Sequence, residues 1–389
     1  MATFGTGPAR PSARVRRRRL FAGVAGAVVV LAVVGGTIAA VSFARAGADA
    51  RATQAAAPPT APASSPEATP EPTPLTPEDE LLATTSDPAA CVVSFTGEGV
   101  ADAPMLQTQG ALYTDLPIPA REGLVFAGWY ANPEDAAAVA IPGRINGSDT
   151  VVCTDRRVTL QGAWMSPEQN AAEDARIPIL MYHQFTANPQ GESGWLRGNY
   201  AYIGDFDAHM THIATTGFYL PTWDELSAFI DGRLFLPKHS VIVTDDDCDM
   251  TWLQMAVPIV VEKKVLTTAF CITIDGTGPS PSPYVQQRSH THDMHRAGDD
   301  GDGRIVNLSV PEIVADMETS AAVLGVKQVM AYPFGHYDDT AKEGLRQAGF
   351  EMARTIEPGS VTIGTDKLAL PTVRINYGMG LDALVGLIG

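Results

Sequence analysis

Basic residues are scarce in this 389-residue chain, which carries 27 Lys and Arg against 44 Asp and Glu and a net charge of −17. The shortage is uneven, because residues 1–45 hold seven Arg and neither Lys nor an acid, so residues 46–389 carry −17 − 7 = −24. A protein that binds nucleic acid needs a basic face for the phosphates. The acidic body of the chain therefore argues against a nucleic-acid partner.

Charge is missing altogether from residues 20–44. Twenty-five helical residues span about 37 Å, which is enough to cross a bilayer core of roughly 30 Å. Six Arg precede this run, and positive charge stays on the cytoplasmic side. We therefore expect a basic cytoplasmic tail (1–19), a transmembrane anchor (20–44) and an extracellular remainder held at the cell membrane. A cleaved signal peptide is the alternative, because residues 44–46 resemble a small-residue cleavage site, although the apolar run exceeds the usual ~7–15 residues of such a signal.

Residues 45–88 consist mainly of Ala, Pro, Thr and Ser. Such a composition cannot bury a core and predicts an extended, semi-rigid linker. Residues 89–166 then show strand-like segments separated by Gly- and Pro-rich turns, which predicts a small β domain. Cys91 and Cys153, two of only four cysteines, bracket this domain. In an oxidising exterior we expect them to form a disulfide, worth ~4 kcal/mol in the chain-entropy model.

Strands and helices alternate from about residue 176 onward. The patterns predict strands over residues 177–183, 241–244, 266–274 and 328–332, and helices over residues 203–216, 223–231, 252–264, 311–324 and 338–348. Such alternation is typical of a parallel β/α architecture. In a β/α barrel, active residues gather at the carboxyl ends of the strands, and His183, the acids Asp245–Asp247 and the loop after Tyr332 all occupy such ends.

Three consecutive carboxylates at the end of a buried strand repel one another and are poorly solvated, so a fold keeps them where something compensates. A bound cation is the usual compensation. His290, His292 and His295 follow about forty residues downstream. The sequence therefore predicts a metal site built from the acids and this histidine cluster.

Residues 176–377 resemble the polysaccharide deacetylases of carbohydrate esterase family four. Residues 244–248 match the family motif TFDDG at three of five positions, His290-Thr291 with His295 matches its histidine motif, and residues 331–335 match a YPYG-like turn. The resemblance implies a distorted (β/α)7 barrel that removes acetyl groups from sugars with a divalent metal. It implies metal ligands at Asp247, His290 and His295, most often for Zn²⁺, and a catalytic base at Asp246.

The chain departs from the family pattern at three places. Asp245 replaces a Phe, which adds a negative charge beside the base and is expected to raise the pKa of one carboxyl in the group. Cys248 replaces a Gly, at a position that often needs a backbone conformation other residues resist; it is either paired with Cys271 or a free thiol. No histidine follows His336, so the usual C-terminal acid is missing. His183 is our expected catalytic acid, with His336 as the alternative, and His292 remains an alternative metal ligand.

Residues 121–130 and 158–164 resemble the internalin-type B repeat, also called the Listeria–Bacteroides repeat. That resemblance implies a β-grasp-like fold that acts as a spacer or interaction module. We expect Trp129 and Trp164 in its hydrophobic core, and a platform that stacks on sugars is the alternative.

Together these features predict a membrane-anchored enzyme that removes N-acetyl groups from amino sugars of peptidoglycan or another N-acetylglucosamine polymer and releases acetate. An O-acetyl polysaccharide esterase and a surface-binding protein that has lost catalysis are the alternatives.

Overall fold

A computed structural model describes residues 74–389. The predicted cytoplasmic tail, the predicted anchor and the linker as far as residue 73 lie outside the described residues. Within residues 74–389, no helix is both long enough and apolar enough to cross a membrane.

The first described helix, α1 (Pro77–Ala83), lies inside the predicted linker. Thr76 caps its first turn by accepting a hydrogen bond from the Asp79 amide, and Pro77 opens the helix at a position where a missing N–H costs nothing. The Glu78 carboxylate accepts a hydrogen bond from Ser94, which ties α1 to the following sheet. The expectation of an extended linker is therefore wrong for residues 77–83.

A five-stranded mixed sheet follows, in the order β2-β1-β5-β3-β4. Its strands are β1 (Ala90–Thr96), β2 (Met105–Thr108), β3 (Val125–Tyr130), β4 (Arg144–Ile145) and β5 (Arg157–Met165), with α2 (Pro133–Ala138) between β3 and β4. β1 and β5 pair in parallel, and the other pairs are antiparallel. Phe126 packs edge-on against both Trp129 and Trp164, which places these tryptophans against the apolar cluster as expected. Cys91 and Cys153 form the predicted disulfide.

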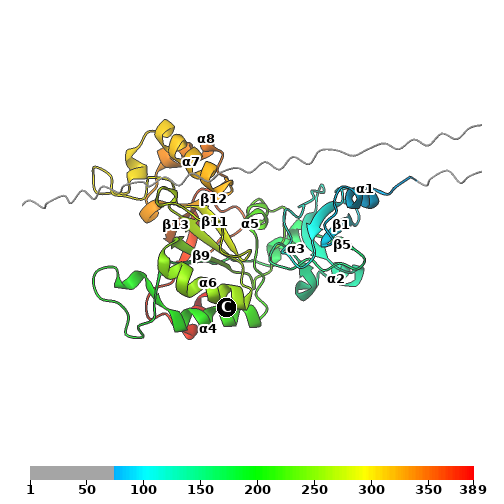
Figure 1. The fold of residues 1–389 in the computed structure, drawn as a ribbon, viewed down its shortest axis with the longest axis horizontal. Coiled ribbons are helices and arrows are strands. Elements are labelled where there is room, and N and C mark those ends of the chain that lie inside the picture. The colour runs from blue at the N-terminus through cyan, green and yellow to red at the C-terminus, as the bar shows by residue number, and fades with distance from the viewer. Residues whose placement is uncertain (1–73) are drawn as a thin grey trace, which may run out of the picture. The chain divides into compact units, whose positions relative to one another are not determined.

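Seven parallel strands build a closed barrel in the order β10-β11-β12-β13-β14-β6-β9. Figure 1 labels β9, β11, β12 and β13 of this barrel. They are β6 (Ile179–Tyr182), β9 (Ile242–Asp247), β10 (Thr267–Cys271), β11 (Val285–Ser289), β12 (Val329–Ala331), β13 (Met352–Pro358) and β14 (Leu370–Arg374). β11 and β12 share a single paired position, so the ladder is thin there. The mixed α/β architecture expected from the sequence is confirmed.

Helices accompany the strands of the barrel, with α4 and α6 near one another in Figure 1 and α7 beside α8. The helices of this region are α3 (Pro167–Ala172), α4 (Ile203–Thr215), α5 (Trp223–Ile230), α6 (Val257–Lys263), α7 (Val310–Leu324), α8 (Asp339–Ala348) and α9 (Leu381–Ile388). A π-helical turn over Trp252–Ala256 leads into α6. Two short strands, β7 (Gln184–Thr186) and β8 (Tyr200–Tyr202), pair beside the barrel.

The sheet and the barrel share one hydrophobic core. Phe126 and Trp129 of β3 belong to the same buried cluster as Leu226 of α5 and Leu234, which follows that helix. The backbones also meet, because the Phe126 amide donates to the Arg233 carbonyl and the Phe235 amide donates to the Phe126 carbonyl, both at 2.9 Å. The sheet is thus packed into the barrel through apolar side chains and backbone hydrogen bonds.

A buried polar cluster lies at the same junction. The Arg144 guanidinium, whose side chain is fully buried, lies 3.2 Å from the Glu225 carboxylate of α5 and donates to the Phe235 carbonyl at 2.6 Å. Asn146 and Tyr219 also donate to Glu225. Each charge therefore has a partner of opposite sign, which offsets the free-energy cost of removing the two charges from water.

Candidate active site

Asp247 ends β9 at a sharp turn of the chain. Its φ is +78°, and φ of Cys248 is +54°. Both values lie in the left-handed region that non-glycine residues seldom adopt. The structure therefore shows why a glycine suits position 248, and it shows that Cys248 accepts this conformation.

His290 follows β11 directly and is fixed by the neighbouring strand. Its Nδ1 lies 2.9 Å from the carbonyl oxygen of Ala331 in β12, so Nδ1 carries the proton and Nε2 is left with a free lone pair. That Nε2 lies 3.6 Å from Asp247 Oδ1, and His295 Nε2 lies 3.5 Å from the same oxygen. Burial lowers the pKa of His290; burial and then His290 lower the pKa of His295 to about 4. Both rings are accordingly neutral and can ligate a cation.

The three side chains fit a divalent cation. Their ligand atoms lie within 4.8 Å of one another. Asp247 Oδ1 is buried without a hydrogen-bond partner among residues 74–389, whereas Oδ2 accepts a hydrogen bond from Gln184 Nε2 at 3.0 Å. A buried carboxylate oxygen left without a donor is costly unless a ligand uses it. Two imidazoles and a carboxylate form the donor set of many zinc sites with an open position.

Asp246 lies on the same strand end, almost fully buried, and forms an ion pair with the buried guanidinium of Arg354 in β13. Burial is the largest single effect and raises the pKa of Asp246, but Arg354, His183 and His290 together outweigh it and lower the pKa to about 2. The carboxylate is therefore ionised at neutral pH. Neither Arg354 nor Gln184 was singled out from the sequence.

His183 is placed beside Asp246, with Nε2 3.7 Å from Asp246 Oδ2. Burial lowers the pKa of His183 even though Asp246 opposes the shift. The alternative residues make other contacts. His336 accepts a hydrogen bond from the Gly303 amide at 2.7 Å, and His292 Nδ1 lies 3.0 Å from the Thr273 hydroxyl. The structure thus brings together the five residues expected first and gives His292 and His336 other partners.

Asp245 is fully buried, and neither of its carboxylate oxygens has a hydrogen-bond partner among the described residues. Burial and then the neighbouring Asp246 raise its pKa well above the usual value. Burial raises the pKa of Asp247 as well, with Asp246 adding to the shift. The expected rise in the pKa of a carboxyl in this group is therefore confirmed in direction.

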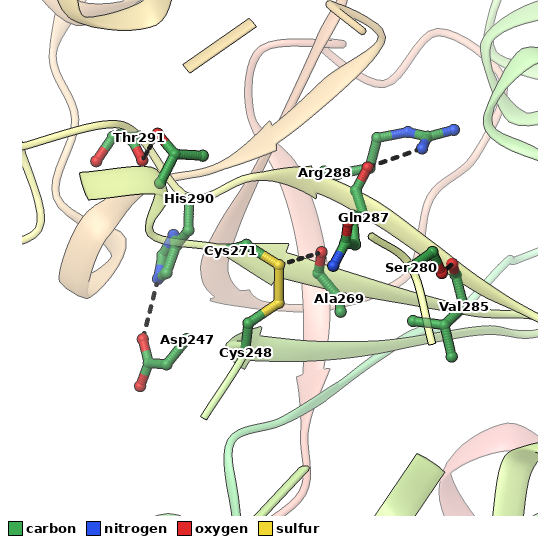
Figure 2. Close-up of a disulfide and its surroundings, with 11 residues drawn as sticks. Asp247, Cys248, Ala269, Cys271, Ser280, Val285, Gln287, Arg288, His290 and Thr291 are labelled. Carbon is green, nitrogen blue, oxygen red and sulfur yellow. Dashed lines mark hydrogen bonds and ion pairs between the residues drawn. A yellow bond between two sulfur atoms is a disulfide. The ribbon is translucent and has the colours of Figure 1, made fainter. Parts of the chain in front are cut away.

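Cys248 and Cys271 form a disulfide between the ends of β9 and β10, with their Cα atoms 4.9 Å apart (Figure 2). The choice that the sequence left open, between a bridge and a free thiol, is thereby resolved in favour of the bridge. Both cysteines and Asp247 line a small cavity of about 140 Å³.

Comparisons with known proteins find relatives among the deacetylases, although no family model matches the chain. A poly-beta-1,6-N-acetyl-D-glucosamine N-deacetylase of Staphylococcus aureus is 25% identical over 161 residues, which covers 36% of this chain and 56% of that protein. YxkH, named as a candidate polysaccharide deacetylase of Bacillus subtilis, is 23% identical over 238 residues, 57% of this chain and 77% of that protein. Among solved structures, the Streptococcus pyogenes deacetylase PplD in complex with acetate has 19% identity and a TM-score of 0.47, covering 56% of this chain and 99% of that one.

The chain spans little more than half the length of the Staphylococcus relative. Because no family model matches, the resemblance to an internalin-type repeat stays a prediction. Both curated relatives are named as deacetylases, at 25% and 23% identity to this chain.

Proposed function

We propose that this protein is a metal-dependent deacetylase that removes acetyl groups from N-acetylated amino sugars of a surface polysaccharide and releases acetate. One observation carries the proposal: an ionised Asp246 and His183 lie beside a three-residue cluster, Asp247, His290 and His295, that fits a divalent cation. The similarity to a poly-N-acetylglucosamine deacetylase supports an N-acetylated polymer as the substrate.

The chemistry divides between the cation and the protein. A divalent cation, for which we propose Zn²⁺, would polarise the acetyl carbonyl and acidify water at this position. Asp246 Oδ2 takes a proton from the attacking water as the new carbon–oxygen bond forms. That proton would pass to His183 Nε2, 3.7 Å from Asp246 Oδ2, because burial leaves this ring neutral at rest. His183 would then deliver it to the sugar nitrogen as the carbon–nitrogen bond breaks, so the products are an amine and acetic acid, which ionises to acetate, and both side chains return to their starting states. Arg354 keeps Asp246 ionised between turnovers.

The direct test is acetate release from N-acetylglucosamine oligomers, with and without a chelator and with Zn²⁺ added back. We expect chelation to abolish release and Zn²⁺ to restore it. Asp246→Asn and His183→Ala should each lower kcat by about 10²–10⁴-fold, the usual contribution of a general acid or base. His336→Ala is the matched histidine control and should retain near-normal turnover.

Each rival gives a different result in this assay. Release from O-acetylated but not N-acetylated oligomers would replace the proposal with an O-acetyl esterase. Binding of the oligomers without release of acetate would show a protein that keeps the fold and has lost catalysis. Loss of turnover in His336→Ala, with His183→Ala unaffected, would overturn the assignment of the acid.

We also propose that residues 20–44 anchor the protein in the cell membrane, with the catalytic barrel outside the cell. The charge pattern of the N-terminal region supports this orientation, and two disulfides suit an oxidising exterior. Protease added to intact cells should digest the barrel while a tag before residue 20 stays protected. Release of the protein into the medium would indicate a cleaved signal peptide instead.

A further inference from the structure

Each cysteine of the Cys248–Cys271 disulfide is connected through the backbone to one of the proposed metal ligands, Asp247 or His290. Cys248 is the residue directly after Asp247, and Figure 2 shows the bridge beside the contact between Asp247 and His290. At the other end, the carbonyl oxygen of Cys271 accepts a hydrogen bond from the His290 amide at 2.9 Å. One covalent bridge thus connects the backbone that carries Asp247 with the backbone that carries His290.

The backbone around Asp247 needs such support. Asp247 and Cys248 are consecutive non-glycine residues with positive φ, a backbone conformation that is strained for residues other than glycine. Cys271 and Asp247 form the last register pair between β10 and β9, so regular strand pairing does not continue beyond this point. Among the described residues, the Asp247 carboxylate accepts one hydrogen bond, from the side-chain amide of Gln184. Without the bridge, the carboxylate would rest on a strained strand end and a single hydrogen bond.

We propose that the Cys248–Cys271 disulfide is a positioning element of the metal centre: it holds Asp247 at the correct distance from His290, and metal affinity falls when it is removed. This inference rests on the proposed function, because it assumes that Asp247 and His290 bind the metal. Groups that orient metal ligands without touching the metal typically change affinity by about 10–100-fold. We expect a loss of this size.

The second disulfide supplies a matched control. Cys91–Cys153 closes a loop within the five-stranded sheet, with a sequence separation of 62 residues against 23 for Cys248–Cys271. Its polar contacts are with its own strand and with Gln109. Removing it should lower the stability of the fold and leave metal affinity unchanged.

The experiment measures Zn²⁺ affinity by competition with a chromophoric chelator. It compares the oxidised wild type, Cys248→Ala/Cys271→Ala and Cys91→Ala/Cys153→Ala, all checked for native circular dichroism. Alanine removes the thiols, which would otherwise bind Zn²⁺ themselves. We expect Cys248→Ala/Cys271→Ala to bind Zn²⁺ about 10–100-fold more weakly than the wild type, and Cys91→Ala/Cys153→Ala to bind it with wild-type affinity. Both variants should melt at a lower temperature than the wild type.

A second variant, Cys248→Gly/Cys271→Ala, keeps the test decisive if the alanine variant does not fold, because glycine removes the penalty of the positive φ at position 248. We expect it to fold and still to bind Zn²⁺ more weakly than the wild type. Wild-type affinity in a folded variant without the bridge would overturn the inference and leave the proposed function intact. Failure of the oxidised wild type to bind any divalent metal would overturn both.

Discussion

The junction between sheet and barrel offers a sharp test through Arg144. Its side chain is fully buried, pairs with Glu225 of α5 and donates to the Phe235 carbonyl. Arg144→Met keeps much of the aliphatic volume but removes the charge and both donors. It leaves the Glu225 carboxylate, only 10% exposed, without its cation.

The size of the effect follows from these contacts. Breaking a buried ion pair by removing one partner costs about 3–5 kcal/mol, because the remaining charge stays buried. Glu225 keeps four other donors, namely the Tyr219 hydroxyl, the Asn146 side-chain amide, and the backbone amide and hydroxyl of Thr222. We therefore expect the lower end of the range, about 3 kcal/mol. At roughly 2 °C per kcal/mol, the value for large domains, Tm falls by about 6 °C.

Thermal unfolding followed by far-UV circular dichroism and by protease cleavage measures this loss. Arg157→Met is the matched control, since Arg157 on the same sheet pairs with Asp79 while both side chains are more than a third exposed. Exposed pairs contribute about 0–1 kcal/mol. In Arg144→Met/Glu225→Gln the unpaired charge disappears too, so the double variant should be more stable than the sum of the single losses predicts. A loss below about 1 kcal/mol in Arg144→Met would refute the reasoning.

Three further changes test other parts of the structure. Asp245→Leu removes a buried carboxyl that has no hydrogen-bond partner among the described residues, and it should stabilise the protein, measured with a chelator present to remove metal, by about 1–3 kcal/mol. Because burial raises the pKa of Asp245 in the folded state, the wild type loses stability as pH rises above about 4, so the gain in Tm from the substitution should grow over that range. Asp316→Ala removes the acceptor of two backbone amides between His290 and His295, the proposed metal ligands, and should weaken Zn²⁺ binding by about 10–100-fold, whereas Glu318→Gln on the same helix should not. Burial lowers the pKa of His209, so stability is lost as pH falls below about 6.5, and His209→Gln should flatten that slope in pH-dependent melting curves.

The helices whose apolar residues recur regularly could be predicted from the sequence, whereas two barrel strands rich in polar residues could not. Helices α4, α5, α7 and α8 lie within a residue or two of the expected ranges, because their apolar residues recur at helical spacing. β11 reads VQQRS and β14 reads LPTVR, and neither shows the apolar run of a buried strand. Their neighbours in the barrel supply the burial that the local pattern lacks.

The residues of the candidate site also divide into those that a local sequence pattern reveals and those that it does not. Asp247, His290 and His295 were found because they occur in short motifs at the ends of strands. Arg354 was missed because it pairs with Asp246 across 108 positions of sequence. A signal did exist, since Arg354 is the single charged residue in the buried half of β13, but it has meaning only once a buried carboxylate is known to face it.

The shared core of sheet and barrel limits how far this protein can be cut down. A fragment that begins at residue 176 would expose the apolar surface of Leu226 and Leu234, which β3 covers in the intact chain. Such a fragment would tend to aggregate rather than give a minimal enzyme. Truncated forms for crystallisation or biotechnology should therefore start before β1, and swapping the sheet for another module would require redesigning the barrel surface that the sheet covers.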